Sequence, residues 1–215
     1  MVTDFILVRH GETDYNELSV LQGWIDTALN EIGREQAELT AEILREEEFD
    51  EVWHSDLQRA RCTAAAILKY HPDVPVYPCM KLREWKLGIL QNYSHAELEK
   101  EYPEYEEMLR NEEIELSIPG GESRGEFQRR INEAFQELAD RSPGKRLLIV
   151  SHGGVLVRLF HFLGEKVPED RKKFFPGNAS VSRVRYDHAA KKWSLIVWNQ
   201  TCPPRSGKMS DTPAL

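Results

Sequence analysis

Two short apolar segments of this sequence each lead into a histidine that is followed by glycine. The first, Phe5 to Val8, precedes Arg9-His10-Gly11, and the second, Leu147 to Val150, precedes Ser151-His152-Gly153. Such short apolar runs are too brief for a helix and are typical of buried strands. If both strands lie parallel in one sheet, His10 and His152 emerge at the same carboxyl edge, where open α/β sheets bind ligands.

Two arginines accompany these histidines. Arg9 directly precedes His10, and Arg59 falls in the first turn of a helix expected from about Leu57 to Tyr70, after a short strand at residues 51–54. A long side chain in that turn can reach back to the carboxyl edge of the sheet, beside backbone amides that attract anions. Taken alone, Arg59 has the alternative of lying on a solvated helix face, because exposed arginines are common.

These four side chains together suit phosphoryl chemistry. Guanidinium groups form paired contacts with the oxygens of a dianionic phosphoryl group, and a neutral imidazole, with an ordinary pKa of about 6.5, is a competent nucleophile without a metal ion. A departing alcohol also needs a proton. Glu84 is the candidate donor, because it lies beside Trp85 and Leu87, where partial burial would favour a protonated carboxyl group. The alternative for Glu84 is an ordinary surface glutamate.

The remaining pattern alternates strands and helices. Asn30 is expected to cap a helix that runs to about Glu47, and Ser55 and Asp56 to cap the helix at residues 57–70. Further helices are expected at residues 123–140 and 155–163, and a closing hairpin at residues 179–187 and 192–198. This order predicts a three-layer α/β fold, with a mostly parallel central sheet, helices on both faces and an inserted cap segment.

The sequence predicts a single domain at residues 1–202, an insertion at about residues 81–121, and a flexible C-terminal tail at residues 203–215. Within the insertion, Ser94 and Glu97 form a capping box, and the acidic helix that follows is expected to break near Pro103. We expect the insertion to lie over the sheet edge as a cap; the alternative is a solvated loop without a function. Two readings are open for Ile89, Leu90 and Tyr93: an apolar mouth of the site, or the core of the cap.

Composition excludes several classes of function. The net charge is −8, and residues 95–116 hold nine glutamates, so nucleic acids and anionic membranes are not expected partners. The three cysteines have unpatterned spacing, which favours a reducing, cytoplasmic setting over a disulfide framework. The sequence lacks a glycine-rich loop ending in Lys-Ser or Lys-Thr and lacks paired histidines at zinc-protease spacing, so we expect no cofactor and no metal.

Six ordered motifs, spread from about Thr3 to Trp198, resemble those of the histidine phosphatase superfamily, and more narrowly its phosphoglycerate-mutase-like phosphatases. They are Arg9-His10-Gly11-Glu12-Thr13 with Asn16, Gln22-Gly23 with Asp26 and Leu29, Ser55 with Arg59-Ala60 and Thr63, Leu82-Arg83-Glu84 with Gly88, Gly120-Gly121-Glu122-Ser123, and Ser151-His152-Gly153-Gly154.

The resemblance implies a phosphoglycerate-mutase-like fold and a phosphohistidine mechanism. His10 would be the nucleophile, Arg9, Arg59 and His152 would hold the phosphoryl oxygens, and Glu84 would act as acid and then as base. Substrate-binding positions implied by the resemblance are Asn16, Gln22, Gly23 and the backbone amide of Gly153. The substrate would be a small phosphorylated metabolite, and both a homodimer and a monomer are open.

Two other functions are open alternatives. Phosphoglycerate mutases of this superfamily characteristically have arginine after the catalytic glutamate and a longer insertion, whereas this chain has Trp85 and a shorter one, which favours hydrolysis. A non-catalytic scaffold that binds phosphorylated ligands would be favoured by loss of any central residue. All five, Arg9, His10, Arg59, Glu84 and His152, are present.

Overall fold

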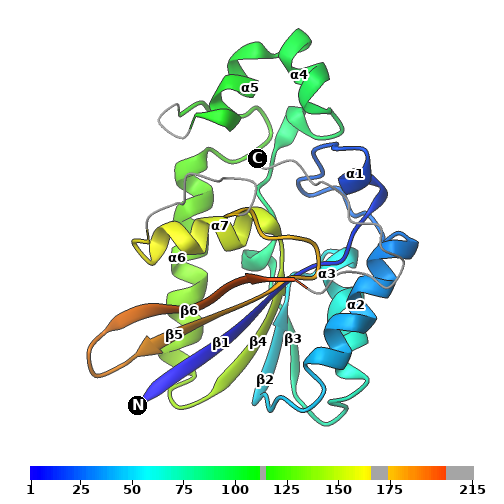
Figure 1. Cartoon of the computed structure of the whole chain (residues 1–215). Helices are drawn as coiled ribbons and strands as arrows, with labels where there is room; N and C mark the ends of the chain where they lie inside the picture. Colours follow the sequence, from blue (N-terminus) through cyan, green and yellow to red (C-terminus); the bar gives the residue numbers. More distant parts are fainter. Residues whose placement is uncertain (112–114, 166–173, 202–215) are drawn as a thin grey trace.

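The computed structural model describes residues 1–111, 115–165 and 174–201, and the statements below concern these residues (Figure 1). The expected tail at residues 203–215 lies outside them. Among the described helices, none combines the length and the apolar character that a membrane span requires.

A six-stranded sheet forms the centre of the fold, in the order β3-β2-β4-β1-β5-β6. The strands β3, β2, β4 and β1 pair in parallel. At the other edge β5 and β6 form a hairpin, and β5 pairs antiparallel with β1. In the β1–β4 pair, Arg9 lies opposite Ser151, so the residues that follow these two strands emerge side by side. The bounds are β1 (Val2–Arg9), β2 (Glu51–His54), β3 (Val76–Pro78), β4 (Arg146–Ser151), β5 (Val181–Asp187) and β6 (Lys192–Gln200).

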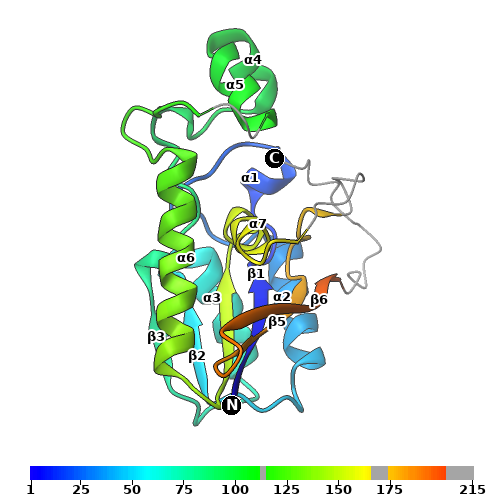
Figure 2. The same cartoon turned by 90° about the vertical axis from the view of Figure 1, so that its left-hand side faces the viewer.

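Helices cover both faces of the sheet (Figure 2). Side chains of β4 alternate between two apolar cores, as a strand buried on both faces requires. Leu147 and Ile149 pack with α6 (Arg124–Arg141) and α7 (Gly153–Phe162), whereas Leu148 and Val150 pack with α2 (Glu31–Ile43) and α3 (Gln58–Leu68). The predicted three-layer α/β architecture is therefore present.

Helix caps agree with the sequence in part. Asn30 accepts a hydrogen bond from the amide of Gly33 and caps α2 as expected. The helix α3 is present as expected, but its expected cap is wrong, because Asp26 Oδ1 of a distant loop accepts from the amide of Gln58 at 2.6 Å. Ser55 Oγ accepts only from the amide of Leu57, at 3.4 Å, before the helix begins. Asp56 instead pairs with Arg83.

The segment after β3 extends beyond the carboxyl edge of the sheet (Figure 1). It contains the short 3-10 helices η1 (Met80–Leu82) and η2 (Gly88–Leu90), followed by α4 (His95–Glu101) and α5 (Pro103–Arg110). The Ser94 capping box and the break at Pro103 are both present. A small apolar core holds these elements together, and it contains Leu21, Leu87, Leu90, Leu98, Met108, Leu109 and Ile118.

Of the two readings for Ile89, Leu90 and Tyr93, the structure favours packing. Leu90 is fully buried in the small core, and Tyr93 packs against it. Ile89 is 39% exposed, and none of the three lines the pocket described below.

Candidate active site

His10 and His152 meet at the carboxyl edge of the sheet. Their ring centroids are 5.2 Å apart, and the two rings meet edge to face. The backbone amide of His10 donates to the carbonyl of Ser151 at 2.9 Å, which continues the β1–β4 ladder and fixes this approach. Both side chains are buried. The parallel pairing expected from the sequence therefore brings the two histidines together.

Hydrogen bonding fixes the tautomer of His10. Its Nδ1 lies 2.7 Å from the carbonyl oxygen of Gly11, which can only accept, so Nδ1 carries the proton and Nε2 keeps its lone pair. Burial, and then the positive charges of Arg59 and Arg9, lower the pKa of His10 well below its usual value. His10 is therefore neutral at physiological pH, with Nε2 able to act as a nucleophile.

His152 is held by a hydroxyl group from β2's carboxyl end. Its Nε2 lies 2.7 Å from Ser55 Oγ, and its Nδ1 is buried without a partner among the described residues. Burial lowers the pKa of His152 well below its usual value, and the positive charge of Arg59 adds to this effect. The hydroxyl of Ser55 thus orients the ring and leaves Nδ1 for another partner.

Arg9 and Arg59 are buried cations without a bonded carboxylate in the part of the chain that the structure describes. Arg9 donates to the carbonyl of Pro176 at 2.6 Å, and Arg59 donates at 2.8 Å to the carbonyls of Ile25 and Gly23. The Nε atoms of both arginines are buried and unpartnered. Burial lowers the pKa of each guanidinium to about 10, while the charge of Glu84 opposes that shift. The site therefore holds positive charge with unused donors, as an oxyanion requires.

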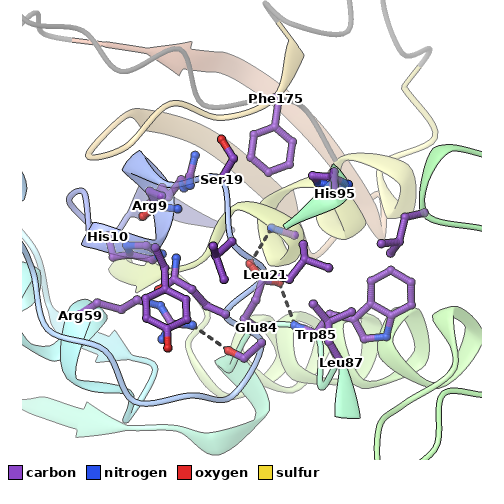
Figure 3. A pocket seen from close by; sticks show the side chains of 17 residues that line it. Arg9, His10, Ser19, Leu21, Arg59, Glu84, Trp85, Leu87, His95 and Phe175 are labelled. Atoms are coloured by element: carbon purple, nitrogen blue, oxygen red, sulfur yellow. Dashed lines mark hydrogen bonds between the residues drawn. The ribbon is translucent and has the colours of Figure 1, made fainter. Parts of the chain in front are cut away.

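Glu84 reaches the same pocket from the loop after η1 (Figure 3). One carboxylate oxygen accepts from the amide of Trp85 at 2.8 Å, and the other accepts from the amide of Gly154 at 3.0 Å. A Cβ atom at position 154 would lie only 2.2 Å from Glu84 Oε1. Glycine at the start of α7 is thus needed for the carboxylate to approach.

Arg130 and Trp24, neither of which the sequence analysis identified, hold the backbone that carries Glu84. Arg130 donates to the carbonyls of Lys81, Arg83 and Glu84, and it forms a two-point ion pair with Glu122. Trp24 Nε1 also donates to the carbonyl of Glu84, at 2.7 Å. These contacts join segments far apart in sequence, so no local pattern could have revealed them.

Of the other expected binding positions, three line the pocket and Gly153 does not. Asn16, Gln22 and Gly23 line it. Asn16 Oδ1 accepts from the amide of Thr13, Gln22 Oε1 accepts from the hydroxyl of Thr27, and the Gly23 carbonyl binds Arg59. Gly153 begins α7 close behind Arg9, since a Cβ at position 153 would lie 3.3 Å from Arg9 Nε.

Sequence reasoning missed much of the part of this pocket that lies beyond His10, the two arginines and Glu84, which we call the outer pocket. The missed lining residues come from separate segments with no shared motif: Tyr15, Ser19, Val20, Leu21, His95, Leu109 and Phe175. Phe175 also packs against the Arg9 guanidinium, at 5.2 Å from its ring centroid. Within the described ranges, no group of three or more His, Cys, Asp or Glu side chains is arranged to hold a metal ion.

The lowered pKa of His10 predicts that the free energy of unfolding decreases as the pH is lowered. As the pH falls through about 6.5, the unfolded chain binds a proton on His10 and on His152 that the folded chain does not. Each histidine therefore contributes a slope that approaches about 1.4 kcal/mol per pH unit. We expect His10→Asn, which keeps a donor for the Gly11 carbonyl, to remove one histidine's share of the slope between pH 6.5 and 5.5. Urea unfolding in phosphate-free buffer measures it, and an unchanged slope would contradict a neutral, buried His10.

Known proteins resemble this chain over most of its length. The profile of the histidine phosphatase superfamily (branch 1) matches residues 5–201. A metal-independent phosphoserine phosphatase of Arabidopsis thaliana is 39% identical over 202 residues, covering 92% of this chain and 82% of its own length. Phosphoglycerate mutase-like protein 4 of the same plant is 35% identical over 198 residues, covering 91% and 84%.

Solved structures give the same result. The native structure of a mycobacterial glucosyl-3-phosphoglycerate phosphatase superposes with a TM-score of 0.78 at 31% identity, covering 94% of this chain and 100% of that one. These findings confirm the predicted family, fold class and phosphatase activity. The chain belongs to the histidine phosphatase superfamily.

Proposed function

We propose that this phosphatase hydrolyses small phosphomonoesters through a phosphohistidine formed on His10, without a metal ion. The observation that carries the proposal is the neutral, buried His10, which lines a pocket together with two buried arginines that have unused donors. A nucleophile and positive charge at one point suit a phosphoryl group that is transferred in line.

In the first step the phosphoryl oxygens bind Arg9, Arg59 and His152, and His10 Nε2 attacks phosphorus. The P–N bond forms as the P–O bond breaks, and Glu84 donates a proton to the departing alcohol oxygen. The support for this role is the placement of Glu84 in the pocket that His10, Arg9 and Arg59 also line.

In the second step Glu84, now ionised, takes a proton from the water that attacks the phosphohistidine. The P–N bond breaks, phosphate leaves and His10 is restored. In this proposal Asn16, Gln22, Gly23 and the amide of Gly153 position the phosphoryl group and the substrate around it.

Hydrolysis is favoured over mutase-type transfer by the residue that follows Glu84. Trp85 lines the pocket, its Nε1 donates to the carbonyl of Glu122, and its ring stacks on Phe127. No cation stands at this position to hold a substrate carboxylate.

We further propose that residues 81–121 act as the cap of a single domain. We also propose that the enzyme works in the cytoplasm, a setting suited to the exposed free thiol of Cys62.

His10→Ala is expected to lower kcat/KM for p-nitrophenyl phosphate at least about 10³-fold, because the nucleophile is lost. Assays contain excess chelator. A rapid quench in alkali with ³²P-labelled substrate measures the phosphoenzyme, because a phosphohistidine is stable in base and hydrolyses in acid. His71→Ala, which removes a histidine outside the pocket, is the control. Phosphate trapped on the His10→Ala protein, or no turnover by the natural sequence between pH 5 and 8, would overturn the proposal.

Glu84→Gln should lower kcat/KM for phosphate esters of alkyl alcohols, which are poor leaving groups, by about 10²-fold or more. The loss for aryl esters should be much smaller. The reason is that p-nitrophenolate departs without a proton, whereas an alkoxide does not. The comparison uses kcat/KM, which reports the steps up to phosphoenzyme formation. Equal losses on both kinds of ester would assign the proton donor to another group.

A further inference from the structure

The outer pocket has apolar walls and one histidine that the catalytic proposal does not use. Val20, Leu21, Leu87 and Leu109 contribute the aliphatic part of the wall. His95, the first residue of α4, also lines this pocket (Figure 3). Its side chain is 24% exposed, so a bound substrate can reach it.

A buried carboxylate fixes the orientation of His95. Its Nδ1 lies 3.1 and 2.9 Å from the two oxygens of Glu106, a residue of α5 that is only 2% exposed. Glu106 Oε1 also lies 2.8 Å from Arg110 Nε. Because a carboxylate accepts hydrogen bonds, His95 Nδ1 carries a proton. Nε2 has no hydrogen-bond partner among the described residues and is left for a ligand.

The remaining nitrogen of His95 selects for one kind of group. The neutral ring accepts a hydrogen bond at Nε2, whereas the protonated ring donates one. A hydroxyl group both donates and accepts, so it can bond to Nε2 in either state. A carboxylate accepts only, so it is matched to the protonated ring alone.

We propose that His95, oriented by Glu106, is a specificity-determining residue that binds a hydroxyl on the alcohol part of the substrate. The substrate class is then a phosphomonoester with an apolar carbon frame next to the phosphate and a hydroxyl at its far end. This inference rests on the proposed function, which places the phosphate at His10. A purely structural role for the pair, tying α4 to α5, makes no distinction between substrates, so the test compares substrates.

The experiment uses matched aryl phosphates and phosphate release. Phenyl phosphates with a para hydroxymethyl or hydroxyethyl group are compared with their ethyl and propyl isosteres. A phenyl phosphate with a para carboxymethyl group tests whether the site prefers a carboxylate. The variant is His95→Asn, whose amide can replace Nδ1 at Glu106 but does not extend to Nε2. Glu107→Gln changes an exposed glutamate of α5, the helix that carries Glu106, and is the control.

We expect the natural sequence to prefer a hydroxyl ester over its isostere, and His95→Asn to reduce this preference about fivefold, the effect of one net hydrogen bond. Glu107→Gln should leave the preference unchanged. Equal losses on all esters, or a selective loss on the carboxymethyl ester, would overturn the inference. A natural enzyme that hydrolyses none of the esters would instead overturn the proposed function.

Discussion

Arg9 and Arg59 are buried at the carboxyl edge of the sheet, and in the described chain their hydrogen bonds go to backbone carbonyls and one hydroxyl rather than to carboxylates. Burying a charge without a counter-charge in contact costs several kcal/mol, which hydrogen bonds offset only in part. Their lowered pKa values express the same cost. A bound phosphoryl dianion would supply a counter-charge, which is why we propose that these two cations bind the phosphoryl group.

Two parts of the molecule contribute side chains around these cations. The sheet edge is rigid, because β1 and β4 are central strands buried on both faces, and it carries His10 and His152. Glu84 belongs to the segment beyond that edge, and Arg130 ties its backbone to α6. The proposed proton donor is therefore held against the sheet, whereas His95 belongs to helices with a separate small core. If both proposals hold, substitutions in those helices change substrate choice without disturbing the proposed phosphoryl site.

The sheet and the central side chains could be predicted because local patterns encode them. The apolar runs before His10 and His152 show buried strands, and parallel pairing then places both rings at one edge. Arg59 follows from its position in the first turn of a helix. The predicted cap of α3 was wrong, because Asp26, in a loop distant in sequence, accepts a hydrogen bond from the first amide of the helix. His95 and Phe175 were missed for the same reason: they join the pocket only through tertiary packing, which a short sequence window does not contain.

The most direct test of the central claim is the stabilisation of the unliganded protein by orthophosphate. Binding to the buried cations should raise the free energy of unfolding by about 2.7 kcal/mol at a concentration near 100 Kd, seen as a higher Tm. Arg59→Met should lose most of this shift, whereas Arg61→Met, which removes an exposed arginine of the same helix, should retain it. An equal shift in both variants, or none in the natural protein, would contradict the account.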